Sequence, residues 1–544
     1  MAVGLPCAQC HKDIAAAQAK TAMANTWVAR TTEFNAVAPD DARYSIKAHT
    51  YSVGELSLPI DFMVGGQRHG VGFLSSISTV EGVPLPRPAL IQARYAWSPE
   101  KQKLVLAPGC LPAKPQTLEA KLGLVLSPTF EERCLSCHGQ KTKGVTCESC
   151  HGSPAEHPKR RLTNEESVGV CAQCHVGLTR FADPSGDDLL VANQVVAIQR
   201  SECYLQSGKA FSCTTCHDPH RDATNDKQAV SACLGCHSLN AKKHAAICPV
   251  NAVDGCVACH MPSVEMGALH LVDHLIRVHP EQGVKAVNHR AEWKSQVEPV
   301  TSYLRMIATS TREAADQALA RIRAGEPFYN VAHESSIDAT ASIGGYLGLQ
   351  KGMRLDYGET SEVAHEGARW IIRQRLPRDF RWDAEQLELK AEAANSINEA
   401  QEALKIYPHY LRALNFIGVT FAQREEAKKG AGVLALAAKL YPQDAATKFA
   451  LASALVAAGD KAEAGKAFEE TIALEKDFTA AYLQLGMLES ETGNIRKAIE
   501  TFRSGLQIDP LSLELNENLA QALKQSGEMV RARQAAALAE SLRR

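Results

Sequence analysis

Hydrophobic and polar residues alternate along a stretch near the start of the chain. Apolar side chains at Tyr44, Ile46, Tyr51 and Val53 have polar neighbours, and glycine and proline residues punctuate the rest of the segment. Alternation at a period of two places every second side chain on one face of a strand, while glycine and proline mark turns and edge positions. The pattern predicts a small antiparallel sheet over about residues 44–108.

Small residues recur every 34 positions in the last third of the chain. Three series of small residues share this 34-residue spacing, and prolines recur at the end of the repeats. The positions are Gly459, Gly493 and Gly527, then Gly418, Ala452, Gly486 and Ala520, then Ala464, Ala498 and Ala532, with Pro408, Pro442 and Pro510 and with Lys476 at the missing proline. A repeat of this length, with small residues where helices touch, predicts stacked helix pairs.

The 34-residue period resembles that of tetratricopeptide repeats. Four repeats fit residues 411–544, and Glu399–Pro408 resembles the second helix of a degenerate fifth, so the repeat domain is placed at residues 390–544. The resemblance implies an all-α solenoid that binds a protein partner on its concave face and holds no cofactor.

Residues 290–380 predict a small α+β domain. Ala314–Arg323 has the pattern of an amphipathic helix, and the motifs Ala324-Gly325-Glu326-Pro327-Phe328 and Gly344-Gly345-Tyr346-Leu347-Gly348 follow it. This string resembles the parvulin-type peptidyl-prolyl isomerases. Parvulins carry imidazoles on the first and last strands, whereas the matching positions here hold Arg305 and either Arg369 or Trp370. The resemblance implies a non-catalytic spacer or docking domain, and an irregular α/β linker is the alternative.

Composition and charge bear on whether the chain binds nucleic acid or spans a membrane. The chain has 544 residues and a formal net charge of −2, which gives no sign of a nucleic-acid partner. No stretch approaches 18 uninterrupted apolar residues, so no transmembrane segment is predicted.

Fourteen of the 17 cysteines lie in seven copies of Cys-x-x-Cys-His. This motif attaches haem c, because its two thiols bond the vinyl groups of one porphyrin and the adjacent imidazole takes an axial site on the iron. Zinc ribbons and iron–sulfur sites do not need this His. The sequence predicts seven covalently bound haem c groups, at Cys7/Cys10/His11, Cys134/Cys137/His138, Cys147/Cys150/His151, Cys171/Cys174/His175, Cys213/Cys216/His217, Cys233/Cys236/His237 and Cys256/Cys259/His260.

The close spacing of these motifs predicts the kind of fold that residues 1–285 adopt. One motif in about 40 residues leaves too little protein for an apolar core around each porphyrin, so the haems themselves are expected to form the core. The chain around them should be short helices and loops. The predicted fold class is multidomain: a mostly irregular and α-helical, haem-packed cytochrome domain with a small β insert, a small α+β domain and an all-α solenoid.

Histidines are numerous enough to give every iron a second imidazole. Twelve lie outside the motifs, and nine of these precede residue 290. Electron carriers usually hold iron with two protein ligands, so we expect low-spin haems with His/His ligation. The candidates for the second ligand are His49, His69, His157, His220, His244, His270 and His274, with His279 and His289 in reserve.

Several of these histidines lie in contexts that resemble known families. His157 ends Cys-His-Gly-Ser-Pro-x-x-His and His220 ends Cys-His-Asp-Pro-His, which resemble patterns of cytochrome c554 and related multihaem families. There the second His reaches a different haem. His270 and His274 resemble the closing segment of those cytochromes, which supplies distal ligands. The surroundings of His69 are similar to the insert of multihaem cytochromes fused to tetratricopeptide repeats.

Two functional classes are compatible with this pattern. The first is an electron-transfer protein, not an enzyme, which exchanges electrons with redox partner proteins or extracellular acceptors and docks a protein on its solenoid. A variant is a homo-oligomer in an extracellular cytochrome filament. The alternative is a multihaem reductase of nitrogen or sulfur oxyanions, which would need one haem with an open coordination position.

Haem c is attached outside the cytoplasm, so a periplasmic or extracellular location is expected. Met1–Pro6 has no signal peptide, and we expect the numbering to begin near the mature end. In an oxidising compartment, two of Cys110, Cys203 and Cys248 can pair as a disulfide, or all three can be buried free thiols.

Overall fold

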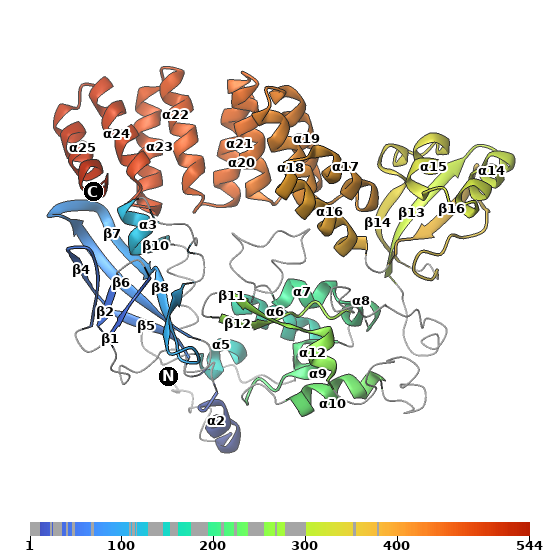
Figure 1. Cartoon of the computed structure of the whole chain (residues 1–544), viewed down its shortest axis with the longest axis horizontal. Helices are drawn as coiled ribbons and strands as arrows, with labels where there is room; N and C mark the ends of the chain where they lie inside the picture. Colours follow the sequence, from blue (N-terminus) through green and yellow to red (C-terminus); the bar gives the residue numbers. More distant parts are fainter. Residues whose placement is uncertain are drawn as a thin grey trace, which may run out of the picture.

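The computed structural model shows a β-rich region, a group of short helices, a small α+β unit and a long helical array (Figure 1). The array runs along one side of the molecule, with the short helices facing it and the other two parts at its ends. The residues that the structure describes are 11–21, 24, 35–39, 42–45, 49–66, 70–107, 110, 115, 117–128, 145–152, 162–175, 194–207, 211–221, 226–237, 255–266, 269–277, 301–351, 355–377 and 380–543.

The β-rich region contains two antiparallel sheets. The first has the strand order β1-β2-β3-β4, and the second has the order β10-β7-β6-β8-β9, with β5 paired to β6. Their strands are β1 (Asn35–Val37), β2 (Arg43–Ser45), β3 (Thr50–Val53), β4 (Leu56–Pro59), β5 (Phe62–Gly66), β6 (Gly70–Val80), β7 (Val83–Ala93), β8 (Tyr95–Ser98), β9 (Lys103–Leu106) and β10 (Gly123–Leu126). The described sheets thus extend beyond the predicted 44–108, because β10 returns to pair with β7 after helix α3 (Leu118–Leu122).

Aromatic residues of the alternating pattern form the centre of this region. Tyr44 and Tyr51 are cross-strand partners, and their rings stack with centroids 5.4 Å apart. Phe73 of β6 lies against Tyr44 at 5.4 Å and is fully buried. Large aromatic rings that meet across two sheets bury much apolar area, which explains how short strands hold together.

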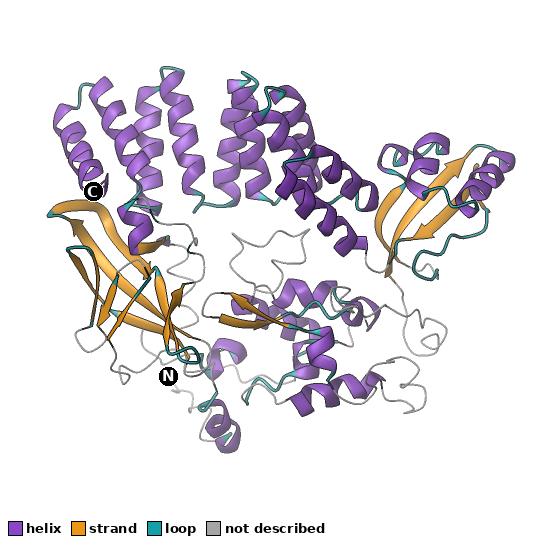
Figure 2. Cartoon of the chain, in the orientation of Figure 1, coloured by secondary structure: helices purple, strands orange, loops and turns teal. Residues whose placement is uncertain are grey.

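The described parts of the Cys-x-x-Cys-His motifs lie in or beside short helices, which Figure 2 shows in purple together with one two-stranded hairpin in orange. Between residues 145 and 277, the described residues include only six buried hydrophobic side chains: Val168, Val195, Ala197, Ile198, Val230 and Leu275. The elements are α2 (Lys12–Gln18), α5 (Cys147–His151), α6 (Asn164–His175), α7 (Gln194–Arg200), α8 (Glu202–Ser207), α9 (Cys213–Cys216), α10 (Asp226–His237), α12 (Cys256–His260), β11 (Ser263–Met266) and β12 (Leu269–Val272). Side chains of this part alone make a very small core.

Residues 301–377 form an antiparallel sheet with helices packed on it. The strand order is β14-β13-β16-β15, and α14 and α15 pack against β13. The elements are β13 (Thr301–Thr309), α14 (Arg312–Arg323), α15 (Phe328–Ser335), η7 (Ala341–Ile343), β14 (Tyr346–Lys351), β15 (Ala364–Glu366) and β16 (Arg369–Arg375). The predicted helix at 314–323 is thus α14, which lies between the first strand and the helix that begins at Phe328.

The helical array consists of five antiparallel helix pairs. Gly459, Gly493 and Gly527 have φ angles of +83°, +83° and +86° in the turns within pairs, a backbone conformation that favours glycine. Gly486 meets the ring of Phe502, where an added Cβ would lie only 2.4 Å from the ring edge. The helices are α16 (Phe380–Ala394), α17 (Ile397–Ile406), α18 (Leu411–Gln423), α19 (Ala427–Leu440), α20 (Ala445–Ala457), α21 (Lys461–Leu474), α22 (Thr479–Glu491), α23 (Ile495–Ile508), α24 (Leu513–Gln525) and α25 (Met529–Arg543). We call this array the solenoid.

The β-rich region packs against the C-terminal end of the solenoid, and we call this contact the clasp. Leu511, Leu538 and Leu542 belong to the same apolar core as the two sheets. Arg87 of β7 donates from Nε to the carbonyl oxygen of Gln507 at 2.5 Å and from Nη2 to that of Ile508 at 2.9 Å. The last carbonyl oxygens of a helix lack hydrogen-bond donors within it. Arg87 supplies donors to two of them at the end of α23, and its positive charge complements the helix dipole.

The α+β unit is joined to the other end of the solenoid. Tyr346 and Leu376 share a core with Phe380 and with Tyr407 and Tyr410 of the first repeats. Arg305 of β13 donates to the carbonyl oxygens of Lys405 and Ile406, at 2.5 and 2.6 Å, at the end of α17. Burial lowers the pKa of Arg305 to about 10. Both ends of the solenoid are therefore covered by apolar contacts and by an arginine on a helix end.

No helix in the described part of the chain is both long and apolar enough to cross a membrane.

A pair of carboxyl groups makes the clasp sensitive to pH. Glu119 of α3 shares a hydrogen bond with Asp509 at the end of α23, and Glu514 of α24 lies nearby. Burial, followed by the charges of Asp509 and Glu514, raises the pKa of Glu119 well above its usual value. The protonated form therefore stabilises the clasp, and this stabilisation is lost as the pH rises through the raised pKa of Glu119.

Replacing Glu119 by Gln should stabilise the clasp at pH 8. The amide keeps a donor for Asp509 but cannot ionise, which removes a like-charge repulsion of about 1 kcal/mol. We expect the melting temperature of the whole chain at pH 8 to rise by about 2–4 °C over that of the parent. The difference should shrink as the pH falls to about 4, because Glu119 is then protonated in the folded chain and largely protonated in the unfolded chain. Glu55→Gln, in an exposed turn of the same region, is the control, and an equal gain in both variants would refute the assignment.

Replacing Arg305 by Met should loosen the junction between the α+β unit and α17. The two carbonyls at the end of α17 would lose charged donors, at a cost of about 2 kcal/mol in the free energy of unfolding. Urea titration of the whole chain followed by circular dichroism measures this loss. Arg312→Met on the exposed face of α14 should change the midpoint little, and the same loss in both variants would contradict the role of Arg305.

Candidate haem-binding sites

The structure describes part of each predicted motif except the one at Cys134, Cys137 and His138. Of the site residues predicted from the sequence, Cys7, Cys10, Cys134, Cys137, His138, His69, His157 and His244 lie outside the described residues, and Cys174, Cys236 and His270 are described only as positions in a helix or strand. The others are His11, Cys147, Cys150, His151, Cys171, His175, Cys213, Cys216, His217, Cys233, His237, Cys256, Cys259, His260, His49, His220 and His274.

Each described motif lies in or beside a helical turn. The one-turn helices α5, α9 and α12 hold the two cysteines, and α6 and α10 end on the histidine of their motif. Positions i, i+3 and i+4 share one face of a helix, so two thiols and the imidazole point to the same side. This is the arrangement that one porphyrin needs. Capping boxes at Thr146 and Ser212 fix the start of α5 and α9.

Two motif histidines each face a histidine from elsewhere in the chain. The rings of His151 and His220 have centroids 6.0 Å apart and planes inclined by 6°, and those of His217 and His274 are 6.2 Å apart and inclined by 27°. A metal–imidazole bond is about 2 Å and a ring nitrogen is about 1.1 Å from its centroid, so two rings on opposite sides of one iron are separated by roughly 6 Å. Both pairs match this spacing.

In His274 and in the motif histidine His260, a hydrogen bond at Nδ1 leaves Nε2 available for a metal. Nδ1 of His274 lies 2.8 Å from the carbonyl oxygen of Val272, and Nδ1 of His260 lies 2.8 Å from that of Arg277. A carbonyl only accepts, so each Nδ1 donates its proton and Nε2 keeps a lone pair for a metal. Nδ1 of His220 faces the carboxylate of Asp218 at 3.4 Å.

Burial also favours the neutral imidazole that binds metal. It lowers the pKa of His217, with a smaller effect of His175, and it lowers the pKa of His274, where the bond to Val272 partly opposes it. The segment around His274 is held by Asp273, which is buried. Its carboxylate accepts from the N–H of Leu275 at 2.8 Å, and its own N–H donates to the carbonyl oxygen of Pro262 at 3.0 Å.

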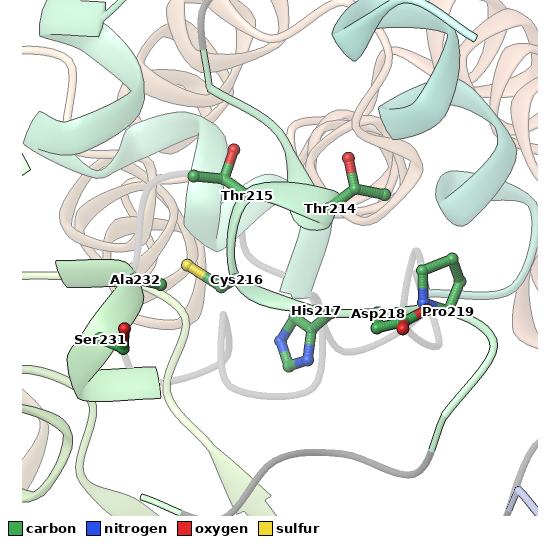
Figure 3. A pocket seen from close by; sticks show the side chains of 8 residues that line it. All are labelled: Thr214, Thr215, Cys216, His217, Asp218, Pro219, Ser231 and Ala232. Atoms are coloured by element: carbon green, nitrogen blue, oxygen red, sulfur yellow. The ribbon is translucent and has the colours of Figure 1, made fainter. Parts of the chain in front are cut away.

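An open pocket of about 450 Å³ lies between α9 and α10 (Figure 3). Cys216 and His217 line it, while Ser231 and Ala232 of α10 line the opposite side. In Figure 3 the side chain of His217 points away from those of Thr214 and Thr215, across the helix. The volume is within the range of small-molecule and cofactor pockets, roughly 300–1,000 Å³. Thiol, imidazole and space thus coincide, and the residues fit a covalently held haem.

His49 lies elsewhere, next to strand β3 of the β-rich region. It has a φ angle of +52°, and its carbonyl oxygen accepts from the N–H of Ile60 at 2.7 Å. Its role as an iron ligand stays a prediction. Sequence reasoning did not single out Asp218 or the carbonyls of Val272 and Arg277. Asp218 lies beside two motif positions and could have been found, whereas backbone carbonyls leave no signal in a sequence.

Comparisons with known proteins identify two parts of the chain. A family described as cytochrome c3 matches residues 140–238, and a family described as tetratricopeptide repeat matches residues 479–510. The first match implies covalently bound haem c and indicates multihaem electron transfer. The second confirms that the helix pairs of the solenoid include a tetratricopeptide repeat. No curated protein matches the chain.

Solved structures resemble the solenoid only distantly. "Crystal structure of MamA" is 23% identical, covers 29% of this chain and 93% of its own, and has a TM-score of 0.27. "MamA 41-end from Desulfovibrio magneticus RS-1" is 15% identical, with coverages of 30% and 92% and a TM-score of 0.28. "Crystal structure of YrrB: a TPR protein with an unusual peptide-binding site" is 17% identical, with coverages of 30% and 85% and a TM-score of 0.27.

Proposed function

We propose that this chain is a heptahaem c-type cytochrome that carries electrons outside the cytoplasm. The observation that carries the proposal is the two facing imidazole pairs, His151 with His220 and His217 with His274, each of which joins a Cys-x-x-Cys-His motif to a second histidine. Each haem, when bound, would supply an iron that alternates between the ferric and ferrous states. Axial ligation by two imidazoles leaves no position for a substrate, which favours electron transfer over a reductase.

The residues of the chain would bind and orient these haems. The cysteines attach each porphyrin, the motif histidine takes one axial position, and His220 and His274 take the second position at the sites of Cys147–His151 and Cys213–His217. The carbonyls of Val272 and Arg277 fix the ring orientation of His274 and His260. Ligands held by several bonds need little rearrangement when the charge on iron changes, which suits an electron carrier.

The other parts would serve assembly. The solenoid offers helix pairs of the kind that bind protein segments, so it would dock a redox partner or a further copy in an extracellular filament. The α+β unit has the strand–helix order expected of a parvulin-like segment, and Arg305 is buried in contacts with α17. An arginine used in this way cannot replace a catalytic imidazole, which supports a spacer without isomerase activity.

The purified chain should carry seven covalent haems. Mass spectrometry of the denatured protein should show seven haem additions, because maturation acts on each motif before the chain folds. Replacing Cys213 and Cys216 by Ala should reduce the number to six, while replacing Cys110 and Cys203 by Ala should leave seven. Fewer than seven additions in the parent chain would refute the heptahaem proposal.

His220→Ala and His274→Ala should each convert one low-spin haem to the high-spin state. Each change removes one axial nitrogen from one iron and leaves the covalent attachment intact. Electron paramagnetic resonance of the oxidised protein should show one high-spin signal per variant over a low-spin background. His333→Ala in α15 is the control and should show none. Unchanged spectra in both variants would mean that these histidines do not bind iron.

A further inference from the structure

Residues 213–220 hold ligands for two haem sites. Cys213, Cys216 and His217 belong to one motif, and His220 faces His151 of another. His217 and His220 are three residues apart, so their backbones are separated by at most about 11 Å. Two sites that share so short a segment must be direct neighbours.

The β11–β12 hairpin connects the same segment to a third site. His274 follows this hairpin and faces His217, whereas the carbonyl oxygen of Arg277, three residues further on, accepts from Nδ1 of His260. His260 is the motif histidine of Cys256–His260. The second ligand of one site and the orienting group of another are thus three residues apart.

Helices α6 and α10 bring two more motifs to α9. Ser212 donates from its hydroxyl to Oδ1 of Asn164 at 3.0 Å, at the start of α6, and the side chain of Cys171 on α6 lies beside that of Cys213. On the other side, Ser231 and Ala232 of α10, which directly precede Cys233, line the open pocket beside Cys216 and His217. The motifs that end at His175 and His237 therefore flank the same site.

On the basis of the proposed function, we propose that the haem site of Cys213–His217 is the junction of the electron path, directly adjacent to the sites of motifs 147–151, 171–175, 233–237 and 256–260. The path is then branched rather than linear. Electrons that enter at any of these four sites reach the others through the iron held by His217 and His274. Asp218, between His217 and His220, is a positioning residue whose charge acts on two sites.

The junction can be tested with His274→Met, and with His220→Met as the matched variant. Methionine ligation raises the reduction potential of one haem. That haem alone can then be reduced at a suitably chosen solution potential. Ferrous low-spin iron is diamagnetic, and its neighbours lose their magnetic coupling to it. In the whole chain, the reduced haem of the His274 variant should alter the paramagnetic resonance signals of more haems than that of the His220 variant. The signals altered in the His274 variant should include some that stay unchanged in the His220 variant.

The junction is refuted if the His274 variant alters no more signals than the His220 variant, or if His274→Met raises the potential of no haem. Haem count and spin state of the parent chain test the proposed function separately. Asp218→Asn is a conservative second variant: it should raise the potentials of two haems, because a negative charge is removed beside two ligands. Asp316→Asn on exposed α14 should raise none. A shift of a single haem by Asp218→Asn would mean that the charge of Asp218 does not act on two sites, which contradicts its place between two haem ligands.

Discussion

The cytochrome region, by which we mean residues 145–277, would depend for its packing on groups that are not amino acids. Its described residues between 145 and 277 bury six hydrophobic side chains, whereas the β-rich region and the solenoid each have extensive apolar cores. Helices of one turn are unstable alone, and here α5, α9 and α12 each begin on the first cysteine of a motif, while the longer α6 and α10 end on a motif histidine. Packing against porphyrins would supply the missing apolar area. Folding of this region is then coupled to haem attachment, and the positions of its helices follow from where the cysteines must lie.

The solenoid has a different requirement, since a stack of repeats needs both terminal faces covered. Here the β-rich region covers one face and the α+β unit the other, each through a shared core. Arg87 and Arg305 have the same role at opposite ends, because each satisfies two carbonyls at a helix end. The two non-haem insertions thus act as caps. Their presence explains how a solenoid of only five helix pairs can stay attached to a region with little core of its own.

Local features of the fold were accessible from the sequence, and long-range pairings were not. The 34-residue period predicted the helix pairs because Gly459, Gly493 and Gly527 occupy the same turn in successive repeats. Alternation predicted the sheet around Tyr44 and Tyr51. Arg87 and Ile508, in contrast, are 421 positions apart, and no periodicity links them. The same holds for His151 and His220. The motif predicted the first axial ligand. Which histidine serves as the second ligand depends on how the β11–β12 hairpin and the helices pack against one another.

The position of the solenoid bears on how a docked partner would exchange electrons. In Figure 1 the short helices of the cytochrome region lie on one side of the solenoid, between the two parts that cap it. Both caps share apolar cores with the solenoid, so packed side chains fix where each cap lies on it. A protein bound to the repeats would be held at a defined place relative to the two caps. The geometry of a docking surface on the repeats would then rest on the two apolar cores and on the two arginines, Arg87 and Arg305, that hold the caps to the helix ends.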